Sequence, residues 1–110
     1  MRLISLLLLS LCGSAYAAHP IRAEDAKIAM DMAKDHGCLS CHALNEKLVG
    51  PAYSKIADKY KDERDAAAGL VQSIKYGSSG KWGRIPMPPH PDMSDADLQK
   101  LARWVLSIEK

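Results

Sequence analysis

Five consecutive residues constrain this chain more than any other feature of its sequence. They are Cys38, Leu39, Ser40, Cys41 and His42, which form the pattern Cys-x-x-Cys-His. Two thiols at this spacing can reach the two vinyl groups along one edge of a porphyrin and become thioethers, and the imidazole that follows then lies under the iron. The pattern therefore predicts one covalently attached haem c, with His42 bound to the iron from one face.

The rest of the chain offers little material for a core of its own. It has 110 residues, which allows one small domain, and it contains no Phe. A domain of this size has only a marginal core unless a disulfide, a metal or a covalently bound group stabilises it. A haem held by two thioethers would be that group, and its flat apolar face would fill the missing volume.

The first 17 residues are predicted to be a secretory signal peptide that is cleaved on export. The segment starts with a positive charge, residues 3–11 are almost entirely apolar, and it ends in the small-x-small pattern Ala-Tyr-Ala. We expect cleavage after Ala17 or Ala18, a periplasmic location, and a monohaem domain that spans residues 18–110.

Two other uses of this segment are disfavoured. As a membrane anchor, its apolar run is much shorter than the ~20 residues that a spanning helix needs. As a lipoprotein signal it would be lipidated at Cys12, but Leu11 is large where such a site needs a small residue. Once the segment is removed, we expect no attachment to a membrane.

The charge balance argues against strongly anionic partners. The chain has 15 Lys and Arg residues against 13 Asp and Glu, a formal net charge of +2, and no basic run. Two haem propionates would lower this charge further. Nucleic acid and anionic membranes are therefore not expected as partners, because both select a clear basic excess.

The sequence predicts an all-α fold of about four helices wrapped around the haem, because no stretch alternates apolar and polar residues as a strand would. Helices are predicted at residues 22–36, 53–60 and 66–76, with a last helix that starts at Ser94. Gly37 is suited to end the first helix. Ser94 is followed three residues later by an Asp, which is the spacing of a capping box.

Residues 77–93 form the second informative stretch. They hold three glycines and four prolines, which exclude a regular helix or a central strand. A connection of this length tends to be functional, and Trp82, Ile85 and Met87 give it apolar groups to bury. We expect an ordered loop that wraps around a ligand.

The iron face opposite His42 needs a second ligand from far along the chain. Met87 is favoured, because Pro86 and Pro88 restrict the backbone on both sides and so fix the direction of its side chain. His90 is the second candidate, although a surface histidine is the better interpretation of it. The remaining candidates are His36, His19 and Met93, the last of which is expected to pack on the final helix.

Ligation by His and Met would leave no open coordination site. The iron could then change its charge with little change in geometry, as electron transfer requires. A thioether ligand also favours the ferrous form and raises the reduction potential relative to a pair of histidines. The predicted function is therefore one-electron transfer, and the protein is not expected to be an enzyme.

Three other interpretations of the Cys-x-x-Cys-His pattern are disfavoured. Thioredoxin-like thiol chemistry expects the two cysteines at the N-terminus of a helix among strands, whereas Gly37 here ends a helix. A zinc site needs four ligands, and only Cys38, Cys41 and His42 cluster in the sequence. A gas-binding or peroxidatic haem protein needs an open sixth site, which the Met87 loop closes.

A recognisable pattern extends over nearly all of the predicted mature domain, and four stretches carry it. They are residues 37–42, 49–53 (Val-Gly-Pro-Ala-Tyr), 80–89 (Gly-Lys-Trp-Gly-Arg-Ile-Pro-Met-Pro-Pro) and 101–106 (Leu-Ala-Arg-Trp-Val-Leu). In these stretches the chain resembles the class I c-type cytochromes, specifically the small bacterial cytochrome c-551 type. The tryptophan-containing loop that ends in Pro-Met-Pro-Pro is the most specific of the four.

The resemblance implies a ligand set and a function. Cys38 and Cys41 would carry the thioethers, and His42 and Met87 would be the axial ligands. The protein would be a monomeric periplasmic carrier that shuttles electrons between respiratory redox proteins, for example to a nitrite reductase, a peroxidase or a terminal oxidase.

The resemblance also implies two supporting hydrogen bonds. In one, Nδ1 of His42 donates to the carbonyl oxygen of Pro51, which orients the imidazole and makes it a better ligand. In the other, the indole N–H of Trp82 donates to a haem propionate. Both residues would therefore belong to the cofactor site.

Three features depart from the pattern of the resembling proteins. His90 stands where an Asn often follows Pro-Met-Pro-Pro, residues 90–93 are longer than the usual connection to the last helix, and Ser73 stands where a basic residue is sometimes found near a propionate. A substitution at His90 is predicted to shift the reduction potential modestly.

A thin haem edge is expected to be exposed for docking, ringed by Val49, Ala52 and residues 85–89. An apolar centre of this kind suits a small, short-lived interface, typically below ~1,200 Å². We also hypothesise a basic rim that tunes the encounter rate. Its members would be Lys34, Lys47, Lys55, Lys81 and Arg84.

Overall fold

The computed structural model describes residues 20–109. The predicted signal peptide at residues 1–17 lies outside this range, together with its cleavage site and the ligand candidate His19. Across residues 20–109, no helix is both long and apolar enough to cross a membrane.

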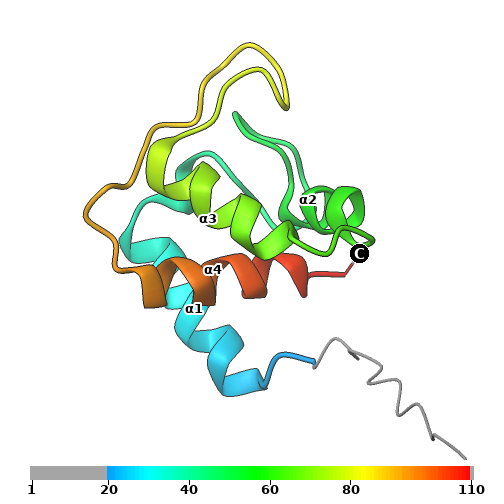
Figure 1. Ribbon diagram of the computed structural model, residues 1–110, viewed down its shortest axis with the longest axis vertical. Coiled ribbons are helices and arrows are strands. Elements are labelled where there is room, and N and C mark those ends of the chain that lie inside the picture. Colours follow the sequence, from blue (N-terminus) through cyan, green and yellow to red (C-terminus); the bar gives the residue numbers. More distant parts are fainter. Residues whose placement is uncertain (1–19, 110) are drawn as a thin grey trace, which may run out of the picture.

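The described residues form four α-helices and no strand, as predicted (Figure 1). The helices are α1 (Ala23–Asp35), α2 (Tyr53–Tyr60), α3 (Ala66–Tyr76) and α4 (Asp95–Leu106), and a short 3-10 turn, η1 (Cys38–Ser40), follows α1. Helices α2 and α3 begin and end at the predicted residues, and α1 is one residue shorter than predicted at each end. The prediction of a small all-α fold is therefore confirmed.

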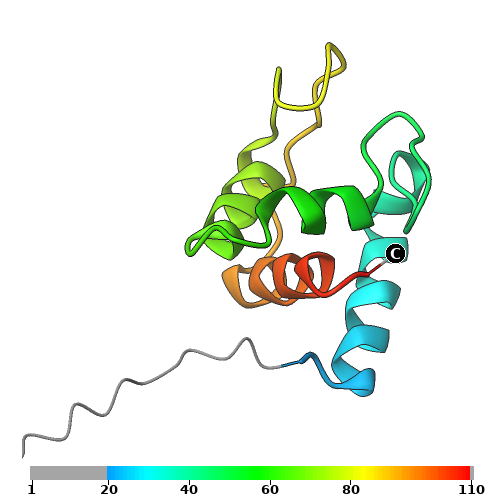
Figure 2. The ribbon, with the colours of Figure 1, turned by 90° about the vertical axis from the view of Figure 1, so that its right-hand side faces the viewer.

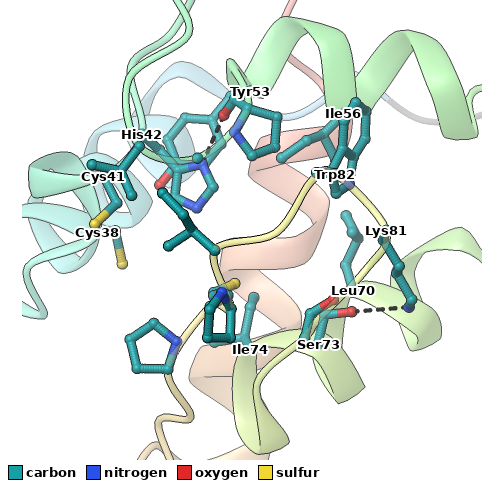
Figure 3. Close-up of a pocket in the computed structure, with 18 of the residues that line it drawn as sticks. Cys38, Cys41, His42, Tyr53, Ile56, Leu70, Ser73, Ile74, Lys81 and Trp82 are labelled. Atoms are coloured by element: carbon teal, nitrogen blue, oxygen red, sulfur yellow. Dashed lines mark hydrogen bonds between the residues drawn. The ribbon is translucent and has the colours of Figure 1, made fainter.

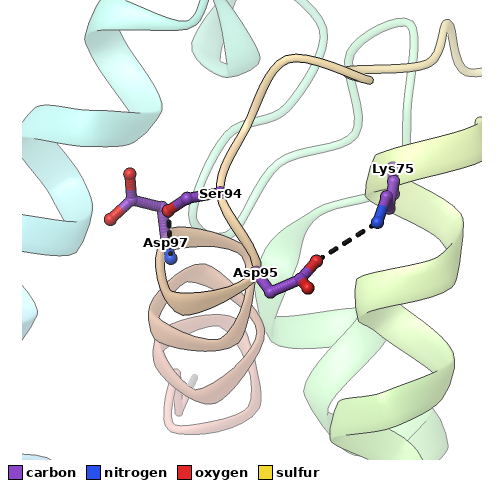
Figure 4. A network of polar contacts seen from close by, with 4 residues as sticks. All are labelled: Lys75, Ser94, Asp95 and Asp97. Carbon is purple, nitrogen blue, oxygen red and sulfur yellow. Dashed lines mark hydrogen bonds and ion pairs between the residues drawn. The ribbon is translucent and has the colours of Figure 1, made fainter.

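Local sequence explains where the first and last helices begin and end. α1 has Glu24 and Asp25 in its first turn, where the helix dipole favours negative charge. It ends before Gly37, which adopts the left-handed conformation (φ 74°) typical of helix termini. α4 begins after Ser94, whose Oγ accepts a hydrogen bond from the backbone N–H of Asp97 at 3.2 Å (Figure 4). The predicted cap of the last helix is confirmed.

Helix α4 forms the centre of the core and packs against each of the other three helices. Figures 1 and 2 show α1 crossing it, with α2 and α3 on its other side. On α1, Ala29 and Ala33 are fully buried on one helical face, and their small side chains let the two helices approach closely. Met93, just before the cap of α4, is 6 % exposed and belongs to the same core, as predicted. The buried residues of α4 are Leu98, Leu101, Ala102, Trp104 and Val105.

Between α3 and α4 the chain projects as a long loop, residues 77–89, which we call the Trp82 loop (yellow to orange in Figures 1 and 2). Two backbone hydrogen bonds close its base: Ser78 N–H donates to Met87 O at 3.2 Å, and Met87 N–H donates to Ser78 O at 2.7 Å. Gly77 enters the loop with a φ of 80°, and a Cβ atom there would lie 2.6 Å from Met87 O. Glycine is therefore required at this position. No helix or strand interrupts the loop, as predicted.

Candidate functional site

A cavity of about 560 Å³ lies between the Cys38–His42 segment and the Trp82 loop, over helices α2, α3 and α4 (Figure 3). Its walls include five large aliphatic side chains of the helices: Ile56, Leu70, Ile74, Leu101 and Val105. All six residues that the sequence predicts for the site also line it: Cys38, Cys41, His42, Pro51, Trp82 and Met87. The fold therefore collects these residues from both halves of the chain around one space.

His42 is buried and is held on three sides. Its Nδ1 atom lies 2.7 Å from the carbonyl oxygen of Pro51. Its ring stacks on that of Tyr53, with centroids 5.0 Å apart and planes 17° apart, and the backbone of Gly50 lies against it. Because a carbonyl oxygen only accepts hydrogen bonds, Nδ1 carries the proton and Nε2 keeps its lone pair. The imidazole is thus oriented, with the correct nitrogen free to bind a metal.

Backbone hydrogen bonds explain why His42 and Pro51 meet. The N–H of His42 donates to the carbonyl of Cys38 at 3.0 Å, which folds the motif into a tight turn. The N–H of Gly50 then donates to the carbonyl of Cys41 at 2.7 Å. The intervening residues 43–49 therefore form a closed loop that returns Pro51 to the side of the imidazole.

Cys38 and Cys41 are free thiols, partly buried, on the same side of the cavity (Figure 3). Burial raises the pKa of the Cys38 thiol, so in the haem-free chain this group stays protonated near neutral pH. Thiol oxidoreductases depend on the opposite shift, usually at the N-terminus of a helix, whereas Cys38 follows the end of α1. The geometry therefore disfavours thiol redox chemistry.

The zinc interpretation is also disfavoured. Throughout the part of the chain that the structure describes, no three side chains of His, Cys, Asp or Glu are arranged to hold a metal ion. The motif thus presents two thiols and one imidazole to a cavity much larger than a metal ion needs.

Three candidates for the second ligand line the cavity, namely Met87, His90 and His36, whereas Met93 is part of the core instead. Met87 is partly buried, and its backbone is fixed at the base of the Trp82 loop by the pairing with Ser78. A thioether held in this way is a suitable soft ligand for a haem iron.

The prediction that His90 is a surface residue is wrong. Its ring is partly buried, and its Nδ1 atom is buried without a hydrogen-bond partner. The reason lies in the backbone, because the N–H of His90 donates to the carbonyl of Ile74 on α3 at 2.9 Å. This long-range bond draws the residue against the helix and towards the cavity.

Trp82 rests on helix α2, although 37 % of it is exposed. Its ring meets that of Tyr60 edge to face, with centroids 6.5 Å apart. The ammonium group of Lys59 lies 4.5 Å from the centroid of the indole, a cation–π distance. These two contacts hold the outer part of the Trp82 loop beside the cavity.

The donor set fits a haem c. Two thiols lie together, an imidazole offers a free Nε2, a thioether lines the same space, and the remaining walls are largely aliphatic. Such walls suit the apolar faces of a porphyrin and keep water from its iron.

Sequence reasoning did not anticipate three supporting contacts. They are the stacking of Tyr53 on His42, the close approach of Gly50 to the same ring, and the position of Lys59 over Trp82. The run Val-Gly-Pro-Ala-Tyr carries the first two, but as a local pattern it indicated only a turn and the start of a helix. No local signal linked Lys59 to the Trp82 loop.

Comparison with known proteins gives one consistent result. The family model described as cytochrome c matches residues 26–109. Cytochrome c-552 of Nitrosomonas europaea is 50 % identical over 84 residues, which cover 76 % of this chain and 82 % of that protein. Cytochrome c-551 of Pseudomonas aeruginosa is 49 % identical over 85 residues, which cover 77 % and 78 % of the two chains.

The solved structures agree with the sequence relatives. The crystal structure of wild-type Nitrosomonas europaea cytochrome c552 superposes with a TM-score of 0.70 at 51 % identity, and the match covers 73 % of this chain and 99 % of that one. The class 1 cytochrome MtoD from Sideroxydans lithotrophicus matches with a TM-score of 0.67 at 27 % identity, over 80 % of this chain and 98 % of that one.

Proposed function

This chain belongs to the cytochrome c family, and from that premise we propose that it is a periplasmic carrier of single electrons between respiratory redox proteins. The family and the relatives named above are c-type cytochromes, which bind haem c covalently and transfer electrons. The chain is accordingly a small electron-carrier cytochrome and not an enzyme.

We propose that Cys38 and Cys41 form the two thioethers and that His42 and Met87 bind the iron from its two faces. One observation carries this assignment: His42 and Met87 line the same cavity. The hydrogen bond from Nδ1 of His42 to Pro51 agrees with it, because it leaves Nε2 free. When bound, the haem supplies a one-electron couple. The chain supplies two fixed ligands, so that no coordination site stays open to substrate or oxygen.

The residues around the ligands would set the potential of that couple. The Pro51 carbonyl makes the His42 imidazole a stronger donor, and the Met87 thioether favours the ferrous form. Exchange of axial ligands spans a large part of a ~0.8 V range. The aliphatic side chains of α3 and α4 keep water away, so little solvent must reorganise when the charge of the iron changes.

An exposed apolar edge supports transient docking at the haem. Val49 and Ile85 line the cavity and are 51 % and 67 % exposed. Apolar groups that face both the cavity and the solvent are suited to a short-lived contact with a redox partner. We propose that nitrite reductases, peroxidases and terminal oxidases are the classes from which the partners come, and that the protein docks as a monomer.

Four of the five residues proposed for the basic rim lie at or beside the cavity. Lys47, Lys81 and Arg84 line the cavity, and Lys55 lies in a shallow groove beside it. Lys34 is exposed on α1 and does not line the cavity. The hypothesis predicts that the rate of electron exchange with a partner falls as the salt concentration rises. A rate that does not depend on ionic strength would refute it.

The ligand assignment is tested by the absorption spectrum of the holoprotein and of Met87→Leu. We expect sharp low-spin bands in the native protein, with a weak sulfur-to-iron band near the red end that Met87→Leu abolishes. Met32→Leu is the matched control, because Met32 packs against the core outside the cavity. A red band that survives in Met87→Leu would overturn the assignment.

The location is tested separately. The full-length gene product is expressed with c-type cytochrome maturation, and the N-terminus of the haem protein is read by mass spectrometry. We expect the haem protein in the periplasmic fraction, starting at Ala18 or His19. Haem protein that still carries residues 1–17 in the soluble fraction would contradict the predicted signal peptide.

A further inference from the structure

We propose that Lys81 supplies the positive charge that holds a haem propionate, and that the hydroxyl group of Ser73 positions its ammonium group. The inference rests on the haem site of the proposed function and adds two residues to it. Ser73 belongs to α3 and Lys81 to the Trp82 loop, so the pair joins two walls of the cavity (Figure 3).

The first observation is the charge of the cavity. Among residues 20–109, three cationic side chains line it, Lys47, Lys81 and Arg84, and no Asp or Glu does. Within residues 20–109, none of the three forms an ion pair with a carboxylate. A largely aliphatic cavity with unbalanced positive charge favours an anionic occupant. A haem carries two carboxylates, one on each propionate, and so supplies the missing charge.

The second observation is where this charge lies. The two vinyl groups of a porphyrin and its two propionates occupy opposite sides of the ring. Figure 3 shows Cys38 and Cys41 on one side of the cavity, and Ser73, Lys81 and Trp82 on the other. A ring bound through the two cysteines therefore directs its propionates towards Ser73, Lys81 and Trp82.

The third observation singles out Lys81 among the three cations. Its Nζ lies 3.4 Å from Oγ of Ser73, a long contact that leaves the ammonium group with two further donors. Trp82 is adjacent in sequence, and its indole N–H forms no hydrogen bond with another described residue. An ammonium group and an indole N–H thus stand together at the same end of the cavity, as a carboxylate requires.

The proposal predicts the sign of a redox effect. An unneutralised propionate stabilises the ferric iron, because oxidation adds a positive charge nearby. The Lys81 ammonium offsets that carboxylate and so favours the ferrous form. Loss of the charge in Lys81→Met should lower the midpoint potential by about 30–60 mV, which is a three- to tenfold change in the equilibrium of one-electron exchange.

The test measures the midpoint potential at fixed pH and the propionate bending mode in the resonance Raman spectrum of the holoproteins. Lys81→Met should lower the potential and shift the mode. Lys81→Arg should keep both near their native values, and Ser73→Ala should give a smaller shift of the same sign. Lys75→Met is the control, since Lys75 is paired with Asp95 at 3.2 Å and does not line the cavity (Figure 4).

Four results would overturn the proposal or one of its two parts. Equal shifts in Lys81→Met and Lys75→Met would show a general charge effect, and equal shifts in Lys81→Met and Lys81→Arg would show that the charge is not responsible. A propionate mode that does not change in Lys81→Met would exclude the contact itself. An unchanged potential in Ser73→Ala would overturn the positioning role of Ser73. The red band reports on the axial ligands in every variant. A failure of the propionate proposal can therefore be distinguished from a failure of the axial-ligand assignment.

Discussion

The imidazole of His42 lies so close to the backbone of Gly50 that a Cβ atom at position 50 would stand 2.6 Å from Cε1 of the ring. The ring cannot move away, because Pro51 and Tyr53 hold it from other directions. Gly50→Ala should therefore tilt the ligand or strain the loop. We expect a loss of about 1–3 kcal/mol in the free energy of unfolding of the holoprotein, measured by chemical denaturation, together with a lower yield of haem protein.

Gly69→Ala provides the control for this prediction. Gly69 lies within α3, and a Cβ atom there meets nothing within 4 Å. Because alanine is the better helix former by about 1 kcal/mol, this variant should be as stable as the native protein or more stable. Equal stability of Gly50→Ala and Gly69→Ala would mean that the close contact between residue 50 and His42 does not affect the free energy of unfolding.

A second prediction concerns the base of the Trp82 loop. Gly77 and Gly80 have nearly the same φ, 80° and 78°, but only a Cβ at position 77 would collide with Met87 O. Gly80→Ala should cost about 1–2 kcal/mol from its left-handed backbone alone. Gly77→Ala should cost more and should also weaken the red band on mild heating, because the clash displaces the backbone of Met87. Identical spectra and stabilities for the two variants would contradict this account.

A third prediction concerns the contact between Lys59 and Trp82. A double-mutant cycle with Lys59→Met and Trp82→Leu should give a coupling of about 0.5–1 kcal/mol in the free energy of unfolding. Urea at low ionic strength is the suitable denaturant, because salt screens the interaction. Lys61→Met combined with Trp82→Leu should be additive, since Lys61 instead pairs with Asp58 at 3.3 Å. Coupling of similar size in both cycles would remove the cation–π interpretation.

A fourth prediction concerns the chain without its haem. Without the haem, the aliphatic side chains that line the cavity, among them Ile56, Leu70 and Leu101, lose their packing partner, and a domain this small has little other core to stabilise it. The double variant Cys38→Ala, Cys41→Ala, freed of haem, should therefore lose much of its far-UV helical signal and its cooperative thermal transition. A sharp transition with native helicity would show that the helices form a sufficient core alone.

Much of the fold could be predicted because its signals are local. Gly37 follows α1, Gly77 follows α3 and Ser94 caps α4, so three helix ends can be located without tertiary information.

The parts of the site that could not be predicted depend on long-range contacts. His90 looks like a loop histidine until its backbone N–H is seen to bond to Ile74. Lys81 looks like one of several surface lysines until the return of the loop places it against Ser73. In both cases the deciding partner is a residue of α3, and nothing in the local sequence names it.

The pairing of Ser78 with Met87 separates the Trp82 loop into a fixed base and a variable tip. Both hydrogen bonds of this pair are made by the backbone, so they do not depend on the side chains at residues 79–86. Apart from Lys81, Trp82 and Pro86, which serve the haem site, those eight positions can therefore diverge, or be redesigned, without loss of the anchor that holds the proposed iron ligand. A lineage, or a protein engineer, could change which partner the protein recognises and leave its ligand geometry intact.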